Sequence, residues 1–287
     1  MKYGLIFANF GERSDPRALA DLGHLAEGAG WDGVFLSDAL QMVGAEQADH
    51  GDPWISLAAI ASRTERVTIG PIVTAPPRYR PWHLARLTTT LDHLSGGRLV
   101  LGIGLGDAYD RAFAAFPEEP DPRQRAAMLD EGLEIIDGLW RGEPFQHHGE
   151  HYQVDEIAFQ PRPVQRPRIP IWVGWKWPNQ KPLQRAARWD GAVPFAMDGD
   201  EYLDLDADQI REVAADLGKR RSGKAPNIPF DIVAYGSLLA SSQDTANRAD
   251  LRAKADAGAT WLVEFIGPEH DTATLEVAIA NGPPTLD

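Results

Sequence analysis

The chain has 287 residues, a formal net charge of −14, 43% hydrophobic residues and no cysteine. This composition is typical of a soluble globular protein, and the absence of thiols excludes disulfide bonds, thiolate metal sites and cysteine nucleophiles. The negative charge argues against nucleic acids and anionic membranes as partners. The apolar run after Lys2 is too short for a secretory signal and no stretch reaches membrane-spanning length, so we expect a cytoplasmic protein.

Strands and helices alternate through the first hundred residues. Short apolar runs predict three strands, at residues 3–9, 33–36 and 67–73. Helical patterns that open at Asp-Pro or Pro follow them, at residues 15–28, 54–62 and 81–94. Parallel strands joined by crossover helices produce this rhythm.

The stretch LDHLSGGRLVLGIGLGD, residues 91–107, combines a helix end, a buried strand and a glycine-rich turn. The helix stops at residues 95–97, where two glycines supply the backbone angles of a tight end. Residues 98–103 then predict a fourth strand that is buried on both faces. Glycines follow at every second position, so the backbone could approach a flat ligand at this strand end.

The second half repeats the alternation around one excursion. A looser segment at 108–123 precedes a long amphipathic helix with Met128, Leu129, Leu133, Ile136 and Leu139 on one face, and residues 142–168, rich in His, Gly and Pro, form an insertion. Further strands are predicted at 169–173, 191–196, 230–235 and 260–266, with helices at 181–189, 209–218, 245–257 and 271–280. Eight strands and eight helices predict one (β/α)₈ TIM barrel domain over residues 1–287, with the insertion between strands four and five.

Several segments resemble, in the same order, those of the bacterial luciferase-like flavin-dependent oxidoreductases. They are residues 26–38, 66–70 followed by Arg80-Pro81, 91–107, 129–152, 161–174 and 186–194. The resemblance implies the same barrel, an oxidoreductase activity on a small organic substrate and a flavin-type cofactor. It also implies a homodimer that pairs through early barrel helices, for which residues 54–62 and 82–94 offer apolar surface.

In such a barrel the active site is built from loops at the carboxyl ends of the strands. The positions expected there are Asn9, Phe10, Ser37, Asp38, Thr74, 104–107, 174–177, 195–197, Gly236, Ser237 and Glu264. Asp38 and Asp107 are the candidate catalytic residues, with helix or loop capping as the alternative for each. Ala39 stands where many relatives carry His, which weakens the case for side-chain proton transfer at this position.

A basic segment marks the expected phosphate site. Between residues 157 and 189 there are seven Lys or Arg residues and no acid, although the chain is strongly acidic. Because strand five ends there, we expect Trp177, Asn179 and Lys181 to offer backbone N–H groups and positive charge to a phosphate. The alternative is a cationic surface that balances the acidic loop after it.

The resemblance assigns cofactor contacts residue by residue. The loop after strand five, which contains Gly174, Trp175, Lys176 and Trp177, helps hold the cofactor phosphate in the family. The two indoles are expected either to stack on the ring or to pack under the loop. Gly104, Leu105 and Gly106 are expected against the flavin ring, with Thr74 behind it, where relatives often have a strained or cis peptide bond.

No metal site is predicted. His147, His148 and His151 lie close together in the sequence, but neighbouring residues on a strand point to opposite faces and no carboxylate spacing completes a site. Nucleophile-elbow and P-loop patterns are also missing.

Two cofactors fit this framework, because the cofactor does the redox chemistry while the protein binds its phosphate, flanks its ring and excludes water. The main hypothesis is a monooxygenase in which reduced FMN from a separate flavin reductase reacts with O₂ and then with the substrate. The alternative is an oxidoreductase that uses the deazaflavin F420 to exchange a hydride with the substrate. A non-catalytic flavin-binding protein is a third possibility, consistent with Ala39.

Overall fold

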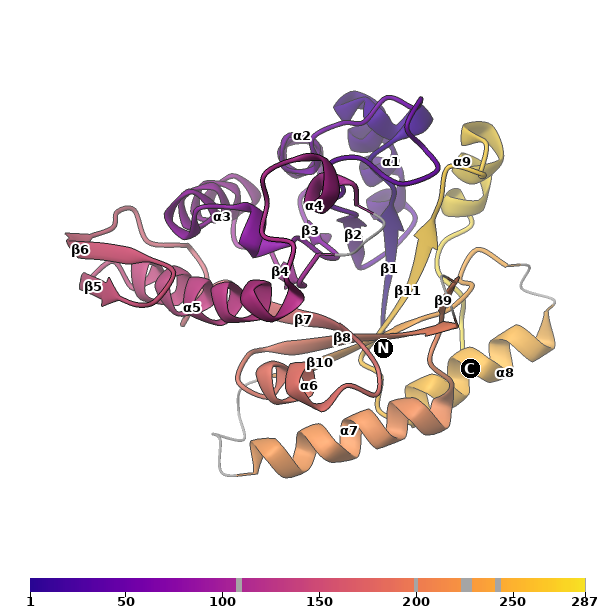
Figure 1. The fold of residues 1–287 in the computed structure, drawn as a ribbon. Coiled ribbons are helices and arrows are strands. Elements are labelled where there is room, and N and C mark those ends of the chain that lie inside the picture. Colours follow the sequence, from indigo (N-terminus) through magenta and orange to yellow (C-terminus); the bar gives the residue numbers. More distant parts are fainter. Residues whose placement is uncertain (107–109, 199–200, 223–228, 241–243, 287) are drawn as a thin grey trace.

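The computed structural model describes residues 1–106, 110–198, 201–222, 229–240 and 244–286 of the chain. Eight parallel strands form a barrel with helices around it, as predicted (Figure 1). In sheet order they are β3 (Thr68–Pro71), β2 (Gly33–Leu36), β1 (Lys2–Phe7), β11 (Trp261–Ile266), β10 (Asp231–Tyr235), β8 (Gly191–Asp198), β7 (Ile171–Lys176) and β4 (Leu101–Ile103). Among the described residues, no helix combines the length and apolarity needed to cross a membrane.

The barrel closes between β3 and β4. Isolated parallel bridges join Ile69 to Leu99 and Thr74 to Ile103 across this seam. A Cβ atom on Gly70 would lie 2.0 Å from the carbonyl oxygen of Val100, so only glycine permits the two backbones to approach this closely. The predicted fourth strand at 98–103 is therefore regular only over β4, while Leu99 is buried and pairs as a single bridge.

Helices follow the strands where the sequence predicts them. They are α1 (Pro16–Gly28), α2 (Pro53–Arg63), α3 (Pro81–Ser95), α5 (Pro122–Trp140), α6 (Gln180–Ala186), α7 (Ala207–Arg221), α8 (Thr245–Asp256) and α9 (Thr272–Ala280). An aspartate side chain accepts a backbone N–H bond at the start of six of them, with proline at the first turn of α1, α2 and α5. These local signals explain why the predicted helix starts agree with the structure.

The insertion and four short elements complete the fold. The insertion at 142–168 contains an antiparallel hairpin, β5 (Pro144–His148) and β6 (Gln153–Ala158), which projects beyond the barrel beside α5 (Figure 1). Glu131 of α5 anchors it by accepting bonds from the backbone of His151 and Tyr152, and His147 lies 3.0 Å from the same carboxylate. Four short elements were not predicted: β9 (Glu201–Leu203), which pairs with β8, and the short helices η1 (Gly11–Ser14), η2 (Pro76–Arg78) and α4 (Ala112–Ala115).

Two hydrophobic layers hold the fold together. The outer layer packs the strands against the helices, and the inner layer fills the barrel. In the inner layer the rings of Phe35, Trp172 and Trp261 lie 5.4 to 5.7 Å apart and close the amino-terminal end. The barrel interior is therefore a packed core closed at its amino-terminal end, as in TIM barrels whose sites lie at the carboxyl ends of the strands.

Candidate active site

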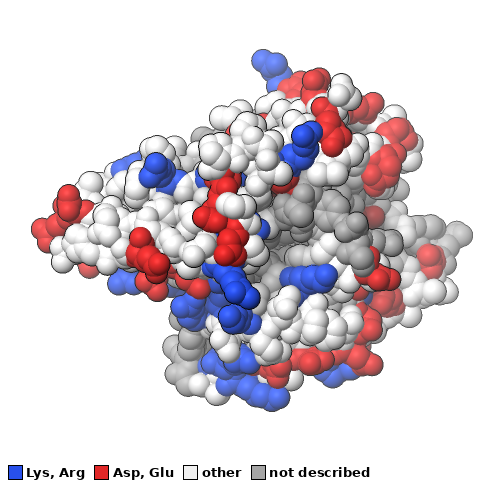
Figure 2. All heavy atoms as spheres, in the orientation of Figure 1, with Lys and Arg blue, Asp and Glu red and all other residues white. Residues whose placement is uncertain are grey.

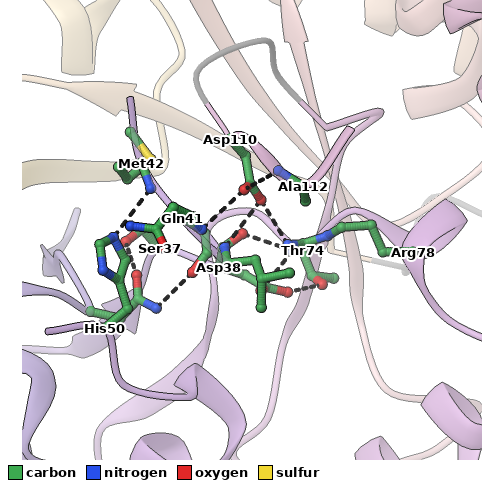
Figure 3. A network of polar contacts seen from close by, with 12 residues as sticks. Ser37, Asp38, Gln41, Met42, His50, Thr74, Arg78, Asp110 and Ala112 are labelled. Carbon is green, nitrogen blue, oxygen red and sulfur yellow. Dashed lines mark hydrogen bonds and ion pairs between the residues drawn. The ribbon is translucent and has the colours of Figure 1, made fainter. Parts of the chain in front are cut away.

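Asp38 lies at the end of β2, where its carboxylate is enclosed by partners (Figure 3). Arg78 donates to it from Nη2 at 2.7 Å, Tyr79 from its hydroxyl at 3.1 Å, and Thr74 from its Oγ1. Only 3% of the Asp38 side chain is exposed. Both carboxylate oxygens are occupied, so Asp38 is placed to organise the site and is not free as a base in this arrangement.

Arg78 also links Asp38 to the loop after β4, which contains Asp110. Its Nη1 lies 2.7 Å from Asp110, which also accepts bonds from the backbone N–H groups of Leu40, Gln41 and Ala112 (Figure 3). Burial lowers the pKa of the guanidinium, but the neighbouring Asp38, Tyr79 and Asp110 more than offset this and raise it above its usual value. Arg78 thus ties together the loops that follow β2, β3 and β4.

A second group fixes the loop after β2 from the other side. The buried amide of Asn9 donates to the carbonyl groups of Ala39 and Gly51, and it accepts a bond from Ser37 at 3.1 Å. His50 Nε2 accepts from the N–H of Met42, so its Nδ1 carries the hydrogen that faces the carbonyl of Ala48. These bonds hold the loop that carries Ser37 and Asp38 in one conformation.

The alternation of side chains along each strand decides what faces the barrel mouth. Ile6, Phe35, Val193, Val233 and Val263 belong to the inner layer, so residues two positions further on point inward at the open end. Val73 packs against the inner layer directly, Gly104 follows β4, and Lys176 ends β7. Together these residues form what we call the inner ring: Ala8, Ser37, Val73, Gly104, Lys176, Phe195, Tyr235 and Phe265.

The predicted glycines lie together on one wall of the mouth. A Cβ on Gly104 would lie 2.8 Å from Val73 Cγ2, and one on Gly174 would lie 3.0 Å from Val73 Cγ1. The peptide bond between Ile72 and Val73 is cis, immediately before Thr74. Thr74 is fully buried, and its hydroxyl donates a hydrogen bond to Asp38. Its predicted contact behind the cofactor ring would therefore be made by its backbone and not by its hydroxyl.

The loop after β4 is fixed from outside the mouth. Gly106 has a φ of 81°, and a Cβ there would lie 2.1 Å from the ring of Phe113, so the turn requires glycine. Arg125 donates to the carbonyl of Leu105 at 3.0 Å. Asp107, the other predicted catalytic residue, lies outside the described residues.

At the end of β7, Trp175 follows the packing alternative, whereas two of the backbone N–H groups expected at the phosphate are occupied. The indole of Trp175 is buried in the outer layer, which leaves only its backbone to contact a cofactor, while Trp177 is half-buried against the same layer. The N–H groups of Trp177 and Asn179 already bond to the carbonyl groups of Phe195 and Lys176. These two N–H groups are therefore not available to a phosphate.

The basic segment divides into paired and unpaired residues. Arg185 and Arg188 bind Asp130, and Arg168 binds Asp190 at 2.8 Å, so these three stabilise the outer wall of the barrel. Lys176 and Lys181 are exposed and form no ion pair with a described residue. Figure 2 shows Lys and Arg side chains gathered around α6, beside the mouth. The two lysines are the cations that could hold a cofactor phosphate.

Comparison with known proteins identifies the family of this barrel. The family model for luciferase-like monooxygenases matches residues 1–279. The chain belongs to this family. Its members are oxidoreductases, so the predicted enzyme class and TIM barrel are confirmed.

Proteins similar to this chain are named for both of the predicted cofactors. The chain is 40% identical to an F420-dependent glucose-6-phosphate dehydrogenase of Microbacterium testaceum over 58% of this chain and 49% of that protein, so it spans about half the length of this curated relative. It shares a TM-score of 0.77 and 16% identity with an F420-dependent secondary alcohol dehydrogenase, covering 97% and 96% of the two chains. With the oxygenating constituent of 3,6-diketocamphane monooxygenase from Pseudomonas putida, in complex with FMN, the TM-score is 0.63 at 18% identity, covering 81% and 66%.

Sequence reasoning missed several residues that the structure places at the mouth of the barrel. Arg78 and Asp110 gave no local signal, because their partners lie more than thirty positions away in the chain. Tyr235 and Phe265 could have been found, since each lies two positions after a buried strand residue that faces the barrel axis. The predicted Glu264 instead points away from the axis, where it accepts bonds from the N–H groups of Leu238 and Leu239.

Proposed function

We propose that this protein is an F420-dependent oxidoreductase that exchanges a hydride between the deazaflavin and a small organic substrate. The observation that carries the proposal is the set of relatives that are F420-dependent dehydrogenases, at 34% to 40% identity over 58% to 74% of this chain. These similarities favour F420 over the FMN monooxygenase that the sequence analysis took as its main hypothesis.

The residues at the mouth fit such a cofactor. Gly104 and Gly174 let the side chain of Val73 pack against their backbone, so this wall of the mouth consists of backbone and one apolar side chain, against which a flat ring can lie. Lys176 and Lys181 supply positive charge for the phosphate that F420 carries. The cofactor, when bound, supplies hydride transfer, so the protein must hold it, exclude water and handle a proton.

The test is an equilibrium titration of the purified protein with oxidised F420 and, separately, with FMN under the same conditions. We expect a micromolar or tighter dissociation constant for F420 and much weaker binding of FMN. Rapid mixing of the F420 complex with substrate should then bleach the deazaflavin absorbance without consuming O₂. Selective FMN binding, with O₂ consumed when FMN is reduced, would instead support the monooxygenase.

A further inference from the structure

The mouth of the barrel is largely apolar. In the inner ring the described side chains of Ala8, Val73, Phe195 and Phe265 carry no polar atom, and Phe265 remains 45% exposed because nothing in the described chain covers it. Hydrophobic residues with 41% to 52% exposure follow other strand ends, namely Leu40, Val43, Phe116, Tyr202 and Leu203. Exposed apolar side chains that gather at the strand ends of a barrel are typical of a site for an apolar ligand.

Among the described residues, the inner ring holds no second cation for a substrate phosphate. Lys176 is the one cation of the inner ring, and in the proposed function it binds the cofactor phosphate. The nearby Arg78 is already neutralised by Asp38 and Asp110. Asp204 lies close enough to Tyr235 to raise the pKa of its phenol, and the buried Lys254 on this side is already paired with Asp204 at 3.8 Å and with Asp250 at 2.8 Å, so it is not a free cation for a phosphate. A phosphate dianion normally requires at least two charge-assisted donors of its own.

One polar group of the inner ring is left for the substrate. The half-buried Tyr235 ends β10 with its side chain directed inward above Val233. Its hydroxyl has no hydrogen-bond partner among the described residues, whereas the hydroxyl of Ser37 is bonded to Asn9. Burial and the Asp204 carboxylate raise the pKa of the Tyr235 phenol, so at neutral pH it remains a hydrogen-bond donor.

From this we infer that the substrate is an uncharged, predominantly apolar carbonyl compound or alcohol, and that the hydroxyl of Tyr235 binds its oxygen atom. The inference rests on the proposed function. It departs from the named activity of the F420-dependent relatives, whose substrate is a sugar phosphate.

The chemistry balances with the reduced deazaflavin as the reductant. In the direction of carbonyl reduction, a hydride from the cofactor forms the new C–H bond at the carbonyl carbon. The O–H bond of Tyr235 breaks and its proton goes to the carbonyl oxygen, which becomes the alcohol. The phenolate regains, through solvent, the proton that the cofactor releases on oxidation. Alcohol oxidation is the reverse, with Tyr235 as the acceptor of the hydroxyl proton.

Substrate class is tested by giving the F420-loaded protein matched pairs of compounds. One set contains cyclic ketones and secondary alcohols, and the other contains glucose-6-phosphate and glucose. We expect kcat/KM for the best uncharged apolar compound to exceed that for the sugar phosphate by about 100-fold or more. A preference for glucose-6-phosphate would overturn the inference while leaving the proposed function intact, and failure of F420 itself to bind would overturn the proposed function.

The role of Tyr235 has a readout besides turnover. Infrared difference spectra of a bound, unreactive ketone should show a carbonyl stretch shifted by the phenol hydrogen bond, and Tyr235→Phe should abolish the shift. The same variant should lower kcat by about 10²-fold or more without changing the F420 dissociation constant. The matched control is Tyr3→Phe, at the opposite end of the barrel. An unshifted carbonyl in the native protein, no ketone binding, or equal behaviour of the two variants would show the inference to be wrong.

Discussion

Arg78 and Asp38 form an ion pair of 2.7 Å in which the side chains are only 7% and 3% exposed. The same guanidinium binds Asp110, so one cation neutralises two carboxylates from different loops. Removing one partner of a buried pair leaves a charge without compensation, which is far more costly than breaking a surface pair.

We therefore expect Arg78→Met to lower the free energy of unfolding by about 3 to 5 kcal/mol and to weaken cofactor binding, because the loops after β2, β3 and β4 lose their common anchor. Urea denaturation measures the first effect. Arg63→Met is the matched control, since its pair with Asp21 is largely exposed and should contribute no more than about 1 kcal/mol. Equal losses of unfolding free energy in the two variants would show that the buried network stabilises the fold no more than an exposed ion pair does.

Lys176 and Lys181 provide the second prediction. If they hold the cofactor phosphate, replacing both by Ala should weaken F420 binding by about 0.5 to 1.5 kcal/mol per lost contact, since both side chains are exposed before binding. Binding isotherms for F420 and FMN measure this loss.

Riboflavin, which lacks the phosphate, is the internal control for the lysine variants. Its affinity should hardly change in the double variant. Equal losses for all three ligands would mean that the substitutions damaged the pocket, and unchanged affinities would place the phosphate elsewhere.

Acid sensitivity of the fold should depend on Glu27. Burial raises the pKa of its carboxyl, but N–H bonds from Arg66, Val67 and Glu65 outweigh this and hold it below the usual value of 4.5. A carboxyl with a lowered native pKa stabilises the fold fully above its unfolded pKa and loses that contribution as the pH falls through the native value.

Glu27→Gln should therefore be less stable than the native protein at neutral pH, and the difference should shrink below about pH 4. Denaturant unfolding across this range measures it, with the exposed Glu134→Gln as control. A stability gap that does not depend on pH would show that the ionised carboxylate is not the stabilising form.

The protein is predicted to form a homodimer through α2 and α3. On the two helices that the resemblance assigns to the interface, Ile55 of α2 is 61% exposed and Leu94 of α3 is 51% exposed. We expect light scattering at micromolar concentration to give twice the chain mass, and Ile55→Glu to reduce it to one chain. Val277→Glu, at an equally exposed position on α9, should leave the mass unchanged. A single-chain mass for the native protein would contradict the prediction.

The sequence by itself determined the order and type of the barrel elements. Apolar runs, Asp-Pro starts and glycine ends are local signals, and they act within a few residues of the backbone they shape. Position along the chain also identified the strand ends that meet at the mouth, including Ser37, Gly104 and Lys176, because parallel strands in a barrel all end on one face.

Only the tertiary structure decided which side chains face the mouth and which are occupied elsewhere. Asp38 reads from the sequence as a free acid at a strand end, yet Arg78, forty residues away, encloses it. From the sequence, the indole of Trp175 could contact the cofactor ring, yet the pleat of β7 directs it into the outer layer. The next residue, Lys176, faces the mouth instead. Ion pairing and burial depend on contacts between distant segments, and a one-residue change of phase reverses the direction of a strand side chain, so neither could be read from local pattern alone.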